Sequence, residues 1–575
     1  MKVLGIESTA HTFGAGIVKD GKVLSNVRDM YVPDRGGIHP RAAADHHVEM
    51  GNIIVRNALE EAGLAENDLD LIAFSRGPGL GPCLRVGATI ARVLSIKNKI
   101  PIVGANHCVA HLEIGGMLGA EDPVLLYASG GNTQVIAHVK GRYRVLGETL
   151  DIGIGNMLDK LGRELGLPFP AGPKIEKLAR GESIPEGRES RDGKPSYHEL
   201  PYSVKGMDVS FSGIMTAALS LREKGVDIQS ICHSIQETCF AMLCEVAERA
   251  MAHIGAGELL LGGGVACNSR LREMASVMTE ERGGKTFFPP RELAVDNGAM
   301  IAYLGEVMHR SGISHTMDET VIDQRFRTDQ VETTWRMDRS IGRITTPGVK
   351  DIDIGEVPPE GTILGRGAEA VIKAVSYDQH PAVIKDRRAK GYRLPELDRM
   401  LTIRRTKKEV RMLMAMREAG IRTPYILDIV PGEGKIIMEL IKGPRLASCL
   451  NLLSDIQKEN ALFKMGSTLG RLHSKGIIHG DMTTSNFLIT SLEKNGIDLC
   501  LIDASLSDRT EEIERMGVDL RLFSEVFTST HPDLLPMEET FRKGYEKGNP
   551  EGSAVLKKVE EINHRGRYLS QDWTS

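Results

Sequence analysis

The stretch that decides the fold of this chain is His107–Thr133, which begins HCVAHLEIGG and ends VLLYASGGNT. His107 and His111 are four residues apart, so on a helix both imidazoles lie on one face, as pairs of metal ligands do. The run Val124–Ala128 is short, apolar and bounded by turn residues, which predicts a buried strand. The small residues from Ser129 onward let backbone N–H groups approach a phosphate closely. One segment therefore predicts two metal ligands beside a phosphate cradle.

Two ligands do not complete a metal site, so the alternative is that both histidines are structural and the glycines form an ordinary turn. Other stretches favour a functional site. The opening residues VLGIESTAHTFGAGIV repeat the order of strand, Ser/Thr/Gly turn and strand, which indicates two similar halves facing each other across a cleft. Leu259–Asn268 (LLLGGGVACN) predicts a strand and a glycine loop that a nucleoside can approach, and Asp296 opens a helix-like run.

Length and composition set the frame for these motifs. A chain of 575 residues is too long for one ordinary core and predicts at least two domains. No stretch reaches the length of a membrane span, and the first residues do not form a signal peptide. The eight cysteines are scattered without a CxxC pair, which predicts a reducing, cytoplasmic location and argues against a cysteine-based zinc site. The net charge of −5 does not indicate a nucleic-acid binder overall.

Residues 1–337 resemble the actin/Hsp70/hexokinase-type (ASKHA) fold, a two-lobed α/β architecture. Within it they resemble the universal tRNA threonylcarbamoyltransferase family, once labelled O-sialoglycoprotein endopeptidases. The matching stretches cover nearly the whole first half: GIESTAHTFGAGIV, NHCVAH, YASGGNTQV, DIGIGNMLDKLGRELGLPFPAGPKIEKLA, FSGIMTA, LGGGVACN and AVDNGAMIA. The resemblance implies transfer of the threonylcarbamoyl group of threonylcarbamoyl-AMP to N6 of the adenosine next to the tRNA anticodon.

The resemblance also implies site residues. One iron or zinc ion would be held by His107, His111, Tyr127 and Asp296. The threonylcarbamoyl-AMP donor would contact Tyr127, Ala128, Ser129, Gly130, Gly131, Asp159, Gly172, Glu176 and Asn268. One departure is Ala171, where many relatives have glycine, and it weakens the expectation of a close backbone contact there.

The residue types agree with this chemistry. Two imidazoles, a phenolate and a carboxylate suit iron or zinc better than magnesium. A metal beside a phosphate cradle can polarise an acyl carbonyl, and the attacking base must be splayed out of its loop. No general base is evident, so we expect positioning and electrophile activation to dominate. A metalloprotease is an alternative, but the glutamate of HExxH is replaced by Cys108. An Hsp70-like ATPase is another, but the second half offers no separate substrate-binding domain.

The second half has a plan of its own, separated by a predicted linker at residues 338–355. Residues 356–575 resemble a small α+β protein kinase, the atypical serine/threonine kinase joined to the transferase in the KEOPS complex. The resemblance rests on ILGRGAEAV, HGDMTTSNFLI and LCLIDASLS, in this order and spacing. It implies ATP and magnesium as cofactors and two further small KEOPS subunits, one that dimerises the transferase and one that activates the kinase.

Each kinase motif implies a role. Asp481 would be the catalytic base, Lys385 would pair with nucleotide phosphates and with Glu409, and Asn486 and Asp503 would bind magnesium. The ATP loop would comprise Ile363, Leu364, Gly365, Arg366, Gly367, Ala368, Glu369, Ala370 and Val371.

The departures from the kinase pattern limit its substrates. The arginine of HRD is replaced by Gly480, no APE triplet follows Asp503, and Asp519 soon begins a helix-like run. The platform for a peptide substrate is therefore missing. We expect an ATPase or self-phosphorylating kinase that regulates or drives the first domain.

One basic run stands out from the acidic whole. Residues 385–411 carry eleven Lys or Arg against four Asp or Glu. Such a run alone is more often a solvated helix face, but beside a tRNA-modifying domain it predicts a phosphate-tracking patch that includes Arg404, Arg405, Lys407 and Lys408.

Overall fold

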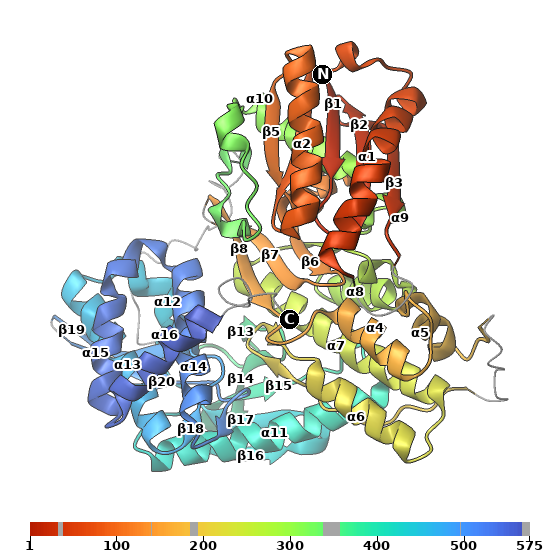
Figure 1. Ribbon diagram of the computed structural model, residues 1–575. Helices are drawn as coiled ribbons and strands as arrows, with labels where there is room; N and C mark the ends of the chain where they lie inside the picture. Colours follow the sequence, from red (N-terminus) through yellow and green to blue (C-terminus); the bar gives the residue numbers. More distant parts are fainter. Residues whose placement is uncertain (33–37, 140, 185–193, 337–356, 495, 566–575) are drawn as a thin grey trace. The chain divides into compact units, whose positions relative to one another are not determined.

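The protein divides into two compact units, Met1–Arg343 and Ile344–Ser575 (Figure 1). The computed structural model describes residues 1–32, 38–139, 141–184, 194–336, 357–494 and 496–565. The predicted linker at residues 338–355 lies outside these ranges, so its bounds stay a prediction. Within the described ranges no helix is long and apolar enough to cross a membrane.

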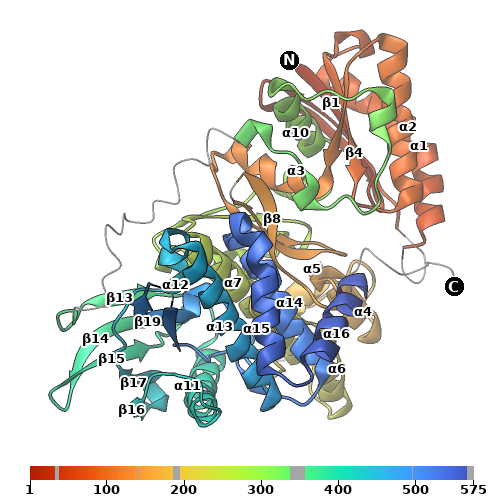
Figure 2. The same cartoon turned by 90° about the vertical axis from the view of Figure 1, so that its left-hand side faces the viewer.

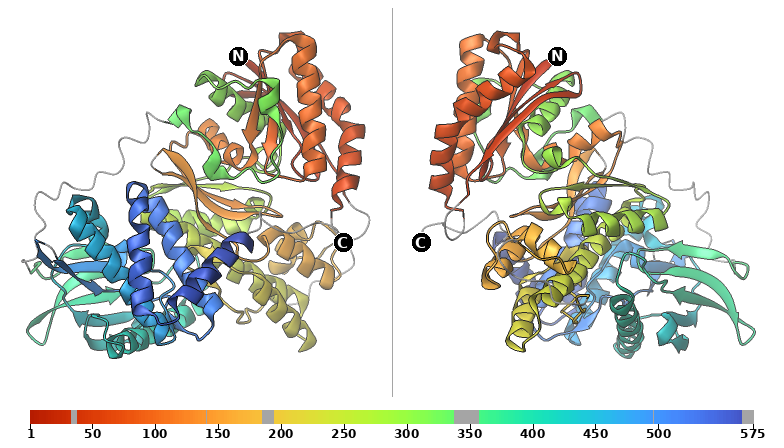
Figure 3. Two further views of the ribbon diagram at one scale, coloured as in Figure 1. Left: turned by 60° about the vertical axis from the view of Figure 1, so that its left-hand side comes forward. Right: turned by 90° about the vertical axis from the view of Figure 1, so that its right-hand side faces the viewer.

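The first unit contains two five-stranded sheets. The first sheet has the order β3-β2-β1-β4-β5 and consists of β1 (Lys2–Glu7), β2 (Thr12–Lys19), β3 (Lys22–Met30), β4 (Leu71–Gly77) and β5 (Ile102–Asn106). Helices α1 (Pro40–Ala62) and α2 (Gly81–Asn98) cover one face, and α10 (Gly298–Arg310) covers the other (Figure 3). Gly5 allows α10 to approach closely, because a Cβ there would lie 2.2 Å from the backbone nitrogen of Ala302.

The second sheet repeats this plan. Its order is β12-β11-β6-β7-β8, from β6 (Val124–Ala128), β7 (Thr133–Val139), β8 (Arg142–Glu148), β11 (Glu258–Gly262) and β12 (Lys285–Phe287). In both sheets three consecutive strands pair antiparallel and two later strands add in parallel. The helices of this lobe include α4 (Ile154–Glu164), α5 (Gly172–Ala179), α6 (Ser212–Glu223), α7 (Ile228–Ile254) and α8 (Ser269–Glu281). The predicted internal repeat therefore extends to whole sheets.

The second unit is α+β, as predicted. Its sheet has the order β13-β14-β15-β17-β16, from β13 (Ile363–Arg366), β14 (Val371–Tyr377), β15 (His380–Asp386), β16 (Ile426–Val430) and β17 (Lys435–Glu439), followed by a smaller hairpin, β19 (Phe487–Glu493) and β20 (Gly496–Leu501). The helices are α11 (Pro395–Glu418), α12 (Leu446–Cys449), α13 (Asp455–Ser474), α14 (Ile513–Thr530), α15 (Glu538–Gly548) and α16 (Gly552–Arg565). Figure 2 shows α13 and α15 side by side. A Cβ at Gly466 would lie 2.0 Å from the carbonyl oxygen of Phe541, so glycine is needed where these helices meet.

Candidate metal centre and nucleotide site

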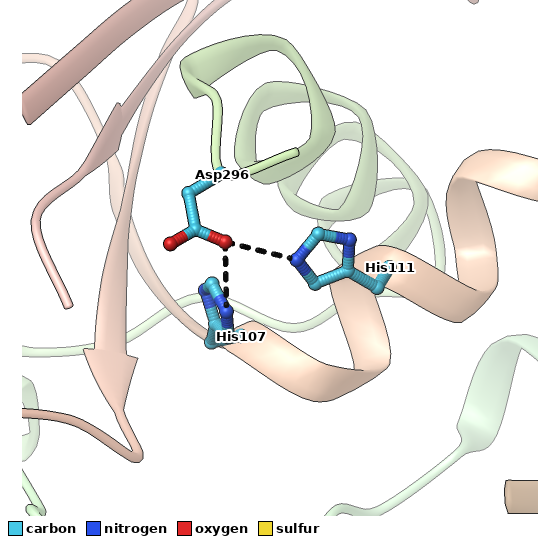
Figure 4. Close-up of side chains that lie close together, drawn as sticks. All are labelled: His107, His111 and Asp296. Carbon is cyan, nitrogen blue, oxygen red and sulfur yellow. Dashed lines mark hydrogen bonds and ion pairs between the residues drawn. The ribbon is translucent and has the colours of Figure 1, made fainter. Parts of the chain in front are cut away.

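The four predicted metal ligands come together at one point of the first unit. Helix α3 (His107–Glu113) follows β5 directly, and Asn106 caps it by accepting a hydrogen bond from the backbone N–H of Val109 at 3.1 Å. Ligand atoms of His107, His111 and Asp296 lie within 4.8 Å of one another (Figure 4). The hydroxyl of Tyr127, on β6, lies 3.0 Å from Nε2 of His107. The helix that follows the first sheet and a strand of the second sheet thus both contribute residues to this cluster.

A fifth residue, Glu7, was missed by the sequence analysis. It ends β1, is fully buried, and accepts a hydrogen bond from Nδ1 of His107 at 3.0 Å. The backbone N–H of Thr9 donates to the same carboxylate at 2.6 Å. A carboxylate on Nδ1 fixes the histidine tautomer and leaves the Nε2 lone pair facing the cluster. The signal was an acidic residue at the end of an otherwise apolar strand.

The electrostatics of the cluster fit a bound cation. Burial by itself would lower the pKa of His107, but the charges of Glu7 and Asp296 outweigh it and raise the pKa to about 9. Burial would raise the pKa of Asp296, yet His107 and His111 hold it well below its usual value. The buried carboxylate of Glu7 and the partly buried carboxylate of Asp296 therefore favour positive charge at this point. A divalent cation with mixed nitrogen and oxygen ligands would satisfy the same requirement.

The predicted phosphate cradle is the turn between β6 and β7. The N-terminus of α4 packs against it, since the backbone N–H of Gly155 donates to the carbonyl of Ser129 at 3.1 Å. Gly130 and Gly131 are exposed, and a Cβ on Gly131 would meet no atom within 4 Å. Packing therefore does not require glycine at this position.

The remaining predicted donor contacts lie at α4, α5 and α8. Asp159 accepts a hydrogen bond from the backbone N–H of Ala171 at 2.8 Å, just before Gly172 begins α5. Glu176 accepts one from the backbone N–H of Ser269 at 3.0 Å, and Asn268 caps α8. These side chains therefore tie the three helices together.

Ala171, where many relatives have glycine, does not fill the predicted donor site with its methyl group. Its side chain is buried, and a Cβ added at Gly162 would lie 2.2 Å from the Ala171 methyl. The methyl group thus packs against α4.

The second unit brings its predicted kinase residues together as well. Nζ of Lys385 donates to Glu409 and to Asp503, each at 2.7 Å. Burial would lower the pKa of Lys385, but the two carboxylates raise it. The side-chain amide of Asn486 donates to the backbone carbonyl of Asp481 at 2.7 Å. The roles of these residues in binding a nucleotide stay predictions.

The helix position predicted for Asp519 was wrong. Asp519 lies inside α14, which already begins at Ile513. Its carboxylate accepts hydrogen bonds from the backbone N–H groups of His479, at 2.6 Å, and Gly480, at 2.8 Å. Gly480 has φ +76, a conformation that a side chain would strain. Only residues 504–512 separate Asp503 from α14, which leaves little room for an activation segment.

The basic run is less available for RNA than its composition suggested. Arg405 pairs with Glu369 of the ATP loop at 3.0 Å, and Lys408 pairs with Asp508 at 3.5 Å. Arg387 is buried and binds Glu409. Counting charges along the chain missed these partners because they come from other segments. RNA binding by this run stays a prediction.

Comparison with known proteins gives the class and then the family. Residues 22–303 match the family tRNA N6-adenosine threonylcarbamoyltransferase (TsaD), and residues 373–537 match the RIO domain. The protein therefore combines a transferase-type ASKHA domain with an atypical kinase domain.

Two curated relatives match along nearly their whole length. A "Probable bifunctional tRNA threonylcarbamoyladenosine biosynthesis protein" of Methanocorpusculum labreanum is 44% identical and covers 99% of both chains. The protein of the same name from Methanothermobacter thermautotrophicus is 44% identical over 99% of this chain and 100% of its own. The chain belongs to this family of bifunctional tRNA threonylcarbamoyladenosine biosynthesis proteins. The predicted family and fold class are thereby confirmed.

A solved structure of the Rio2 kinase from Chaetomium thermophilum, in a complex with ADP, Mg²⁺ and phosphoaspartate, aligns with 36% of this chain and 71% of its own. The identity is 17% and the TM-score is 0.27, too low to add to that conclusion.

Proposed function

We propose that residues 1–337 transfer the threonylcarbamoyl group of threonylcarbamoyl-AMP to N6 of the adenosine next to the tRNA anticodon. We further propose that residues 356–575 bind ATP and magnesium and regulate or drive that cycle by ATP hydrolysis or self-phosphorylation. The observation that carries the first part is the convergence of His107, His111, Tyr127 and Asp296, with Glu7 fixing the tautomer of His107. Family membership supports both parts.

The residues of the first unit would have separate roles in this transfer. The turn at Ser129–Gly131 would bind the donor's phosphate, and Asp159 and Glu176 help to shape the donor site. A bound iron or zinc ion would supply Lewis-acid polarisation of the acyl carbonyl. The flipped adenosine enters at this cluster with its exocyclic amine toward the donor.

The second unit would use familiar kinase chemistry. Lys385 holds nucleotide phosphates, Asn486 and Asp503 hold magnesium, and Asp481 acts as the base. Beyond tRNA and ATP, we propose that the protein works in the cytoplasm with a dimerising and a kinase-activating KEOPS subunit.

Peptidase activity is not favoured. Cys108 occupies the place of the protease glutamate, and burial raises the pKa of its thiol to about 12, which disqualifies it as a base.

The test is nucleoside mass spectrometry on unmodified tRNA incubated with the donor and the KEOPS subunits. We expect threonylcarbamoyladenosine with the intact chain and its loss in His107→Ala. The matched control is His309→Ala, a histidine on α10 outside the cluster, which should retain the product. Asp481→Ala should lower the amount of product formed over many turnovers but should leave the first turnover intact. Absence of product with all partners present would refute the transferase assignment.

A further inference from the structure

Three arginines from separate elements gather beside the glycine loop that follows β11. Arg28 lies on β3, Arg272 on α8, and Arg291 on α9 (Arg291–Ala294). Nη1 of Arg28 donates to the carbonyl oxygen of Glu292 at 3.3 Å, which joins β3 to α9 (Figure 1). The positive charges of all three act on Cys267 in the glycine loop. We call Arg28, Arg272 and Arg291 the arginine cluster.

In the described part of the chain no carboxylate forms an ion pair with the arginine cluster. Among the described residues none of its three members forms an ion pair, whereas the nearby Arg270 binds Glu237 at 2.8 Å. Arg272 instead donates to the carbonyl of Ala266 at 2.8 Å and to that of Pro289 at 3.1 Å. Backbone carbonyls orient the guanidinium groups of Arg28 and Arg272, and the carboxylates of Glu292 and Asp296 act on Arg28 without forming an ion pair with it. Such an arrangement favours an anionic ligand.

Repulsion within the arginine cluster supports the same conclusion. Arg28 and Arg291 are both exposed. Partial burial and the adjacent charge of Arg291 lower the pKa of Arg28, although the charges of Asp296 and Glu292 act in the opposite direction. Like charges held close together cost free energy unless an anion binds between them.

The arginine cluster lies next to the candidate metal centre. Asp296 follows the end of α9 by two residues, and Asn268, a predicted donor contact, follows Cys267 in the chain. A polynucleotide that delivers a base to this centre must bring its backbone phosphates to the exposed rim around it. The donor's own phosphate is the other source of the same chemistry, but its predicted cradle is the turn at Ser129–Gly131.

We propose that the arginine cluster binds backbone phosphates of tRNA next to the target adenosine. The proposal rests on the proposed transferase function for the identity of the RNA. It assigns RNA contact to the first unit, in addition to or in place of the basic run at residues 385–411.

The test measures tRNA affinity by fluorescence anisotropy, without donor, across a KCl series. The test variant is Arg28→Ala/Arg291→Ala; Arg272 is kept because it anchors two backbone carbonyls. Each lost phosphate contact should reduce the slope of log affinity against log salt by about 0.7 to 0.9, so the double variant should lose about 1.4 to 1.8. The charge-conserving Arg28→Lys/Arg291→Lys should keep most of the slope. Arg142→Ala, an exposed arginine on β8, is the control for loss of charge alone.

Titration of the donor adenylate separates the two phosphate sources. We expect unchanged donor affinity and an unchanged melting temperature in Arg28→Ala/Arg291→Ala. An unchanged salt slope overturns the proposal, as does a loss of donor binding with intact tRNA binding. A flattened slope in Arg404→Ala/Lys407→Ala alone also overturns it and returns RNA contact to the basic run. Because binding is measured without turnover, failure of the transferase assay does not affect this outcome.

Discussion

Nδ1 of His107 lies 3.0 Å from a carboxylate oxygen of Glu7, and the two residues are 100 positions apart in the sequence. The contact joins the end of β1 to the start of α3, so the first strand of the fold orients the first predicted metal ligand. Because Glu7 is fully buried, its charge acts on His107 with little screening by water. We regard Glu7 as a positioning residue, since it acts on the metal only through His107.

Glu7→Gln tests this role. The amide keeps the size of the side chain and one acceptor oxygen but loses the charge that makes His107 a strong ligand. We expect metal affinity, measured by competition with a chromogenic chelator, to fall about 10- to 100-fold. The control is Glu306→Gln, a buried carboxylate of the same lobe that binds Arg310. Equal metal affinity in the two variants would show that Glu7 is only structural.

Asp503→Asn tests the nucleotide site of the second unit. The substitution removes a predicted magnesium ligand and one of the two carboxylates that hold Lys385. We expect ATP hydrolysis, followed by phosphate release, to fall about 100-fold or more. Asp498→Asn is the matched control. Asp498 is an exposed residue of β20, and its carboxylate binds Lys464 of α13. Hydrolysis that persists in Asp503→Asn would assign the ATPase activity elsewhere.

Local pattern predicted much of this architecture. The buried strand expected at Val124–Ala128 is β6 with the same bounds, and the four-residue spacing placed His107 and His111 on one short helix. Order and spacing of kinase motifs also predicted the contact between Lys385 and Glu409. These features succeed because periodicity and motif spacing encode them within a few residues or within a known pattern.

Features that depend on distant partners were not predictable in this way. The acidic end of the apolar strand β1 marks Glu7, but its partner is a histidine on another element, which no local pattern identifies. Arg405 was counted as free charge because its partner, Glu369, comes from the ATP loop. The arginine cluster draws its members from β3, α8 and α9, so no single stretch appears basic.

His138 should make the first unit sensitive to acid. Burial and the nearby charge of Arg336 lower the pKa of His138 to about 4, and Thr333 lies 3.1 Å from its Nε2. The unfolded chain takes up a proton near the ordinary pKa of about 6.5 while the folded chain does not, so stability falls as the pH drops from about 6.5 towards 4. The upper limit of this loss in unfolding free energy is about 3.5 kcal/mol, at about 1.4 kcal/mol per pKa unit, before solvent screening.

The measurement is urea unfolding at pH 7, 5.5 and 4.5. His138→Gln keeps a side-chain N–H for Thr333 but cannot gain a proton, so its stability should depend less on pH than that of the native chain. The matched control, His309→Gln, should retain the native pH dependence. If the unfolding free energy of His138→Gln falls with pH as steeply as that of the native chain, this assignment is contradicted.

Glu113 and Arg336 form a buried ion pair at the end of the metal-bearing helix. Glu113 is the last residue of α3, and Nε of Arg336 donates to it at 2.6 Å. Tyr143 donates to the same carboxylate, as does the indole N–H of Trp335 at 3.2 Å. Arg336→Met should destabilise the first unit by about 3 to 5 kcal/mol, because it leaves a carboxylate buried without its cation. The variant should also weaken metal binding, since α3 carries His107 and His111.

A double-mutant cycle separates the pair from packing. Glu113→Gln/Arg336→Met removes both charges, and the amide oxygen can still accept hydrogen bonds from Tyr143 and Trp335. We expect the double variant to recover most of the stability lost in Arg336→Met, because the cost lies in the unpaired charge and not in the lost contact. Urea unfolding followed by tryptophan fluorescence, to which Trp335 contributes, reports on this point. If the double variant is as unstable as Arg336→Met, the guanidinium contributes through its packing over Tyr143, whose ring centroid lies 5.7 Å away.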